Sequence, residues 1–164
     1  MSLSEELYRE TILDHYHNPR NQGVMDKPTV EVEGVNPLCG DELTLYLNVD
    51  KDKIEDIRIK SRGCSINTAS GSMMTEAIKG QDLEGATQLA ESFKNMLLSK
   101  DATTEFIAGE DMEDLEALQG VKKYPVRIKC ALLPWNTLLE GIQSLKSHDG
   151  DIVETIKPQV VTTE

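Results

Sequence analysis

Two alternating segments joined by a polar turn most constrain how this chain can fold. Residues 43–50 carry leucine or valine at every second position, and residues 57–60 do the same with isoleucine. A period of two is typical of strands with one buried face. Residues 50–53 form a short polar turn, so these strands are predicted to pair antiparallel. Val30 and Val32 alternate with glutamates and predict a short edge strand before them.

Helical periodicity occupies most of the remaining chain. Residues 3–17 predict an amphipathic helix that Asn18-Pro19 ends. Gly120 is expected to end a short helix later in the chain. The stripes of apolar residues that follow the strands lie at residues 66–78, 83–97, 112–118 and 128–145. Because strands come first and helices after, the predicted class is α+β, with helices packed on one face of a small three-stranded antiparallel sheet.

The C-terminal part leaves one question open and suggests a domain boundary. Pro134 lies inside the last helical stripe, so that helix either kinks there or begins its regular part there, with Pro134 at its first position. Residues 148–164 show no period and predict a flexible tail. Residues 1–147 are therefore expected to form one domain. A chain of 164 residues can close such a core without disulfides.

Charge and hydropathy exclude several classes of partner. The chain has 17 lysines and arginines against 29 aspartates and glutamates, a net charge of −12. Nucleic acids and anionic membranes are bound through lysine and arginine, so neither is expected as a partner. No apolar run approaches the about 18 residues of a transmembrane helix, and no secretory leader opens the chain. Three cysteines, an odd number, argue against a disulfide framework and favour a cytoplasmic protein.

The residues best suited to chemistry are the three cysteines, each at the boundary of a predicted element. Cys39 precedes the clearest strand, Cys64 lies between a strand and a helix, and Cys130 lies at or near the first turn of the last helix. A first helical turn has unpaired N–H groups and a partial positive charge, which stabilise a thiolate. Asp41 follows Cys39 by two residues and would point the same way in an extended chain. Three thiolates and one carboxylate would make a tetrahedral zinc set.

Simpler interpretations compete for each of these residues. Free cysteines often fill core space, and Asp41 alone reads as an ordinary turn carboxylate. Arg127 and Lys129 would stabilise nearby thiolates, but each alone reads as a solvated charge at a helix start. His15 and His17 are expected to be exposed helix residues. A zinc hydrolase or deaminase is disfavoured because the sequence lacks His-x-Glu and His-Glu-x-x-His, whereas a structural module with buried cysteines would bind no metal.

Three segments together resemble the U-type iron–sulfur cluster assembly proteins, the family of IscU and of NifU N-terminal domains. The segments are Asn36-Pro37-x-Cys39-Gly40-Asp41, Gly63-Cys64-Ser65-Ile66 with Ala69-Ser70-x-Ser72-Met73-Met74, and Arg127-x-Lys129-Cys130 with Trp135. The stretch from Tyr8 to Asn18-Pro19-Arg20-Asn21 also resembles the opening helix of that family, and the match covers about residues 5–145. The SufU branch fits best, because Lys129 stands where the IscU branch has histidine and because the connection from Cys64 to Cys130 is longer.

The resemblance implies a SufE/IscU-like fold and a role in iron–sulfur cluster assembly. It implies that Cys39, Asp41, Cys64 and Cys130 bind Zn²⁺. Cys39 would accept persulfide sulfur from a pyridoxal-phosphate-dependent cysteine desulfurase, with Arg127 stabilising the sulfur anion. The chain would then be at most a zinc-dependent sulfurtransferase acting with that enzyme, not an enzyme on its own.

The alternative role is a scaffold. Such a protein builds a transient [2Fe–2S] cluster on the three cysteines and passes it to downstream assembly proteins or apo-proteins. Because Zn²⁺ outranks Fe²⁺ in the usual affinity order, a tightly held zinc favours sulfur relay over scaffolding.

Overall fold

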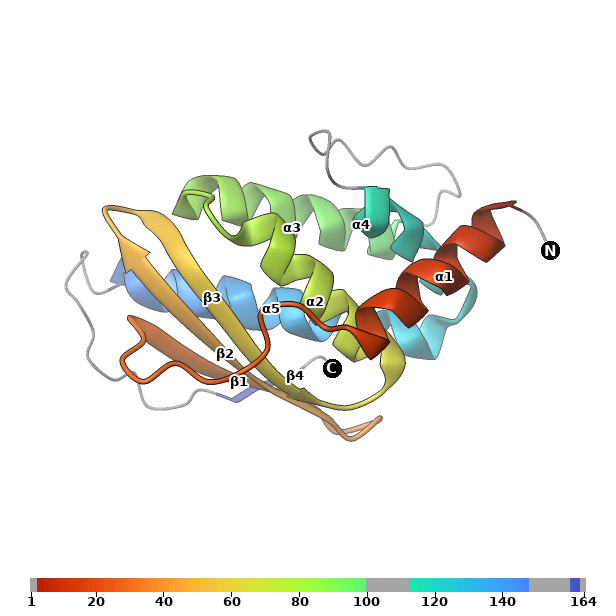
Figure 1. The fold of residues 1–164 in the computed structure, drawn as a ribbon, viewed down its shortest axis with the longest axis horizontal. Helices are drawn as coiled ribbons and strands as arrows, with labels where there is room; N and C mark the ends of the chain where they lie inside the picture. Colours follow the sequence, from red (N-terminus) through yellow and green to blue (C-terminus); the bar gives the residue numbers. More distant parts are fainter. Residues whose placement is uncertain (1–2, 100–112, 148–159, 163–164) are drawn as a thin grey trace.

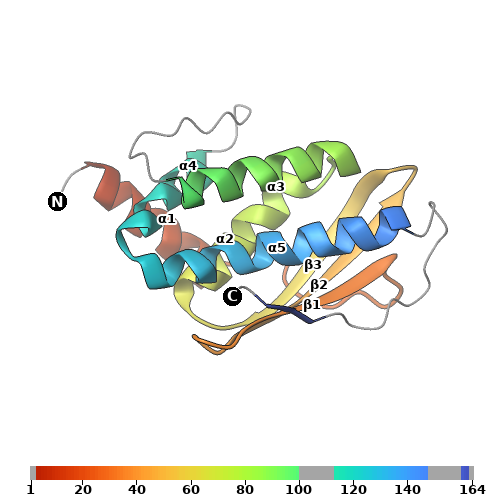
Figure 2. The same ribbon diagram turned by 180° about the vertical axis from the view of Figure 1, so that it is seen from behind.

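The structure, a computed structural model, describes residues 3–99, 113–147 and 160–162 as two layers, a sheet with helices on one face (Figure 1; Figure 2). The helices are α1 (Leu3–His17), α2 (Ser65–Ile78), α3 (Leu83–Leu98), α4 (Glu113–Ala117), the 3₁₀ helix η1 (Leu118–Lys123) and α5 (Pro125–Ser147). The strands are β1 (Val30–Asn36), β2 (Asp41–Asp50), β3 (Lys53–Arg62) and β4 (Val160–Thr162). This arrangement confirms the predicted α+β class.

The sheet has the strand order β3-β2-β1-β4. Strands β1, β2 and β3 pair antiparallel, as predicted, and Val32, Leu45 and Ile59 are opposite one another on the buried face. The prediction that β1 is an edge strand is wrong, because β4 pairs with it in parallel. A three-residue strand has too few positions to show alternation, so only its distant partner reveals it. The rest of the expected tail, residues 148–159 and 163–164, lies outside the described residues.

Helices α2 and α5 cover the sheet, and α3 packs on α5. Pro125 opens α5, and Pro134 lies inside it, so α5 starts well before the proline that left its boundary open. Gly120 does not end a helix but lies within η1, where an added Cβ would be 2.7 Å from the ring of Tyr8. Glycine is needed there because α1 packs directly against this turn.

The core lies between the sheet and these helices. Its largest fully buried side chains include Trp135 and Phe93, whose ring centroids stack 4.4 Å apart. His15 is buried too, which corrects the expectation that it is exposed, whereas His17 is exposed as expected. No helix among the described residues is long and apolar enough to cross a bilayer.

Candidate metal centre

Three of the four predicted ligands meet at one end of the sheet. Figure 1 shows the β1–β2 turn, the β3–α2 connection and the start of α5 at this same end of the molecule. Ligand atoms of Cys39, Asp41 and Cys130 all lie within 4.8 Å of one another. The sulfurs of Cys39 and Cys130, which are 91 residues apart in sequence, are 3.3 Å apart.

The turn that carries Cys39 is shaped by Asn36. The carbonyl oxygen of Asn36 accepts from the N–H groups of Cys39 at 3.3 Å and Gly40 at 2.9 Å, and its Oδ1 accepts from Leu38 N at 3.2 Å. Gly40 has φ of +73°, a conformation that glycine adopts without steric cost. The result is a tight turn that leaves Cys39 half-buried beside Leu38, whose side chain is 69% exposed.

Asp41 has the environment of a cation ligand. Its side chain is fully buried, and Oδ1 accepts a hydrogen bond from the main-chain N–H of Cys64 at 2.9 Å. A Cβ at Gly63 would overlap this carboxylate, so glycine makes room for it. Oδ2 is buried and finds no hydrogen-bond partner among the described residues. A buried carboxylate oxygen without a partner is costly, and a bound cation would remove that cost.

Cys64 lies beside this group rather than within it. It lies between β3 and α2, as predicted, where it is the N-cap residue of α2, and its sulfur accepts from Asn67 N at 3.5 Å. Its sulfur is not among the three ligand atoms that lie within 4.8 Å of one another. The hydrogen bond from its N–H to Asp41 nevertheless holds it next to the other three residues.

Cys130 lies near the first turn of α5, as predicted, and its thiol is buried. Helix α5 begins at Pro125, so Cys130 lies in its second turn, where no unpaired helical N–H groups stabilise a thiolate. Burial raises the pKa of the Cys130 thiol strongly, and Asp41, Cys39 and Cys64 raise it further. A divalent cation would reverse this effect, because a thiol that coordinates a metal is deprotonated.

Arg127 supplies positive charge near the sulfurs. Its guanidinium is exposed, and its pKa is raised mainly by Cys64 and also by Cys130. Lys129 is partly buried two residues further along α5. The predicted residues thus gather at one place, although the structure adds partners that the sequence does not reveal. Asn36 had a faint signal in the turn pair Asn36-Pro37, and Asn67, which lies inside a helix, had none.

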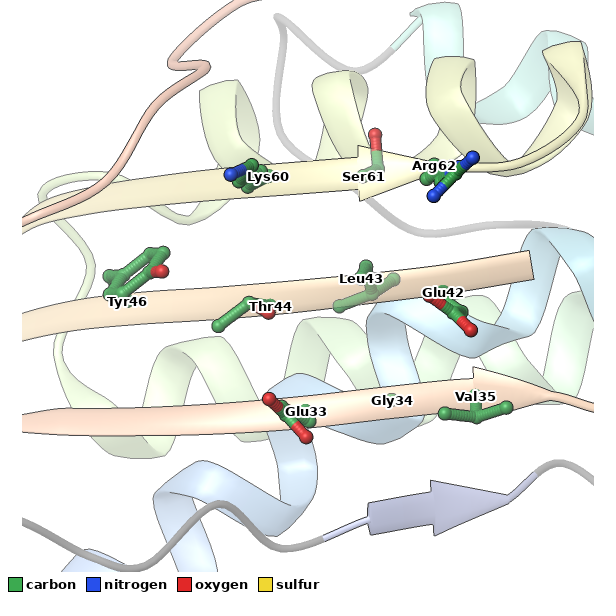
Figure 3. Close-up of a pocket in the computed structure, with 10 residues that line it drawn as sticks. All are labelled: Glu33, Gly34, Val35, Glu42, Leu43, Thr44, Tyr46, Lys60, Ser61 and Arg62. Carbon is green, nitrogen blue, oxygen red and sulfur yellow. The ribbon is translucent and has the colours of Figure 1, made fainter.

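A separate hollow of about 440 Å³ lies on the face of the sheet that the helices leave open (Figure 3). Charged side chains of both signs line it, among them Glu33, Glu42, Lys60 and Arg62. No cysteine or histidine belongs to it, so the gathered sulfurs lie elsewhere.

Comparison with known proteins identifies relatives over nearly the whole chain. Residues 7–144 match the model of the NifU-like N terminal domain. The zinc-dependent sulfurtransferase SufU of Bacillus subtilis is 47% identical over 138 residues, covering 84% of this chain and 90% of the relative. The iron–sulfur cluster assembly scaffold protein IscU of Streptococcus pyogenes is 41% identical over 148 residues, covering 87% and 88%.

Solved structures agree with these matches. A crystal structure described as an iron–sulfur cluster assembly scaffold protein for the SUF system, from Fervidobacterium islandicum, has a TM-score of 0.75 at 36% identity. It covers 85% of this chain and 98% of that protein. The N-terminal part of a NifU-like protein from Brucella abortus has a TM-score of 0.77 at 20% identity, covering 89% and 99%, a likeness of fold alone.

Proposed function

Because the chain belongs to the family of NifU-like N-terminal domains, we propose that it serves iron–sulfur cluster assembly as a zinc-dependent acceptor of sulfur. Cys39, Asp41, Cys64 and Cys130 are the proposed zinc ligands, and Cys39 is the proposed acceptor. The observation that carries the proposal is the buried, unpartnered Oδ2 of Asp41 beside the sulfurs of Cys39 and Cys130. This donor set suits Zn²⁺, which binds thiolate sulfur and carboxylate oxygen. When bound, Zn²⁺ would keep the cysteines ionised at neutral pH.

Cys39 is the acceptor that the local structure supports best. It is half-buried in a surface turn, whereas Cys130 is fully buried and the Cys64 sulfur caps a helix. In the proposed step, the Cys39 thiolate attacks the outer sulfur of a persulfide. A new S–S bond forms at Cys39, the S–S bond of the donor breaks, and the donor cysteine leaves as a thiolate. Arg127 stabilises the anionic sulfur at the site.

The donor of the sulfur is proposed to be a pyridoxal-phosphate-dependent cysteine desulfurase, an enzyme class that produces a cysteine persulfide. Three unpaired thiols suit a reducing compartment, so the cytoplasm is the proposed place of the reaction. The second candidate function is a scaffold for a [2Fe–2S] cluster, favoured by the similarity to IscU. Lys129 stands before Cys130, where the IscU branch has histidine, and this departure supports relay. A scaffold needs ligands that exchange iron readily, whereas a tightly held Zn²⁺ outranks Fe²⁺ in the usual affinity order.

Desulfurase turnover tests the proposal. Sulfide release by the desulfurase is measured in the presence of a reductant, with the zinc-loaded protein and with the demetallated protein. The zinc-loaded protein is expected to accelerate release, and zinc-loaded Cys39→Ala is expected not to. If zinc silences the protein and the iron form is active, scaffolding replaces relay, which [2Fe–2S] absorbance and cluster transfer to an apo-protein would confirm. Zinc retained by the double variant Cys64→Ala, Cys130→Ala would contradict the shared ligand set.

A further inference from the structure

We propose that Asn67 is a positioning residue that holds Cys64 and Cys130 in one spatial relation, and that Pro134 creates the acceptor it needs. The inference rests on the proposed zinc site, because fixing two ligands matters only if both serve one ion. Cys64 and Cys130 lie on different helices, α2 and α5, and no hydrogen bond joins their side chains among the described residues. Asn67 makes a contact to each of them.

The first contact ties Asn67 to Cys64. The main-chain N–H of Asn67 donates to the Cys64 sulfur at 3.5 Å, as expected for the third residue after an N-cap. This contact orients the thiol toward the start of α2. It depends on the backbone, so any residue at position 67 can supply it.

The second contact depends on the side chain. In a regular helix, the carbonyl of Cys130 would accept from the N–H of residue 134. Pro134 has no N–H, and its ring pushes against the carbonyl four residues earlier, so the Cys130 carbonyl loses its helical partner. Asn67 Nδ2 donates to this oxygen at 3.2 Å from within the core. The ligand-bearing residue of α5 is thereby attached to the first turn of α2.

Folding alone explains this arrangement poorly. Asn67 is fully buried, and its Oδ1 finds no donor among the described residues. An unsatisfied buried acceptor costs stability and offsets what the Nδ2 bond contributes. Leucine or alanine at position 67 with a residue other than proline at 134 would satisfy the same backbone without an orphaned group. The combination of Asn67 and Pro134 instead provides a hydrogen-bonded link between Cys64 and Cys130.

A neighbouring contact provides a matched control. Ser70, also fully buried on α2, donates from Oγ to the carbonyl of Ala131 at 2.6 Å and accepts from Trp135 Nε1 at 3.0 Å. Ser70→Ala therefore removes hydrogen bonds between the same two helices at the next residue of α5. Neither Ser70 contact reaches a cysteine.

Zinc affinity, measured by competition with a chromophoric chelator, tests the inference. Asn67→Ala is expected to bind zinc about tenfold or more weakly, a loss typical of groups that orient metal ligands. Ser70→Ala is expected to stay within about threefold of the unmodified protein, although its apo-protein melts at a lower temperature. If both variants lose affinity in proportion to their stability, Asn67 has a structural role only and the inference is overturned.

A double variant separates positioning from stability. In Asn67→Ala, Pro134→Ala, the new N–H of residue 134 restores a partner to the Cys130 carbonyl. The melting temperature of the apo-protein is expected to recover relative to Asn67→Ala, and the zinc affinity is expected to stay low. Recovery of both would overturn the inference, since it would mean that only the satisfied carbonyl matters.

A readout without metal distinguishes failure of this inference from failure of the proposed function. In a Cys39→Ser background, phenylarsine oxide, which requires two thiols, reports the Cys64–Cys130 pair. Asn67→Ala is expected to bind it more weakly and Ser70→Ala to bind it unchanged. If the unmodified protein binds no zinc but Asn67→Ala and Ser70→Ala still differ in phenylarsine oxide binding, the zinc site is refuted and the role of Asn67 is retained. Equal binding by the two variants refutes the role of Asn67.

Discussion

At the scale of single residues, the candidate site depends on side chains that the fold has withdrawn from water. Asp41 and Cys130 are both fully buried, and they are groups whose charged forms are costly to bury alone. Of the two carboxylate oxygens of Asp41, only Oδ1 has a hydrogen-bond partner in the part of the chain that the structure describes, the N–H of Cys64. The site is therefore better suited to a cation than to the empty state, and the behaviour of the apo-protein should reveal this.

The buried Cys130 thiol predicts a pH dependence of apo-protein stability. Its pKa is higher in the folded chain than in the unfolded chain, so the folded state binds the proton more tightly. Stability is then fully present below the ordinary thiol pKa of about 8.5 and falls as the pH rises above it. The slope is at most about 1.4 kcal/mol per pH unit.

Urea unfolding of the demetallated protein from pH 7 to pH 10 measures this dependence. Cys130→Ala, which has no thiol to ionise at that position, is the control and should show a shallower fall. A free energy of unfolding that falls equally in both proteins would contradict the prediction.

At the scale of secondary-structure elements, polar contacts in the core join helices whose relative positions hydrophobic patterning alone does not determine. His15 of α1 forms hydrogen bonds with Ser72 of α2 at 2.7 Å and with Asp114 of α4 at 2.8 Å. A single buried side chain thus connects three helices. The contact also fixes where α4 starts relative to α1, since Asp114 lies in the first turn of α4.

Replacing His15 should destabilise the fold far more than replacing its neighbour. His15→Ala removes two hydrogen bonds and buried ring volume, and it is expected to lower the free energy of unfolding by about 2–4 kcal/mol. His17→Ala, at an exposed position of the same helix, is the matched control and should change it by less than about 0.5 kcal/mol. Equal effects in urea unfolding would contradict the buried contact.

At the scale of the whole molecule, the candidate site joins segments that lie far apart in the sequence. Cys39 and Asp41 belong to the β1–β2 region, Cys64 to the β3–α2 connection and Cys130 to α5. An ion bound by all of them would link the sheet to two helices. Metal binding that requires the folded arrangement contributes its free energy to folding.

Zinc should therefore raise the stability of the whole domain. Zinc present at a thousandfold excess over its dissociation constant is expected to add about 4 kcal/mol to the free energy of unfolding. Calorimetric melting with zinc and with a chelator measures the difference. Cys64→Ser, Cys130→Ser serves as the control and should melt at the same temperature in both conditions. A shift that survives in this control would indicate zinc bound elsewhere.

The sequence by itself determined most of the helices and strands, though not β4, and all four candidate ligands. Alternation over residues 43–50 and 57–60 specifies strands because side chains of a strand alternate between faces, and the result is local. The Cys64 N-cap is also local, since a helix start and its capping residue are adjacent in the chain. Combined cysteine motifs likewise carry the family resemblance without reference to the fold.

Only the tertiary structure decided which of these groups are buried, paired and close together. Periodicity gave His15 and His17 the same expectation, yet packing of α2 and α4 buries one of them. The proline inside α5, the pairing of β4 and the contact of Asn67 with Cys130 all depend on partners far away in sequence. Long-range contacts of this kind follow from how faces pack and not from the pattern of either face alone. The sequence therefore predicted the candidate ligands but not the residues that contact them.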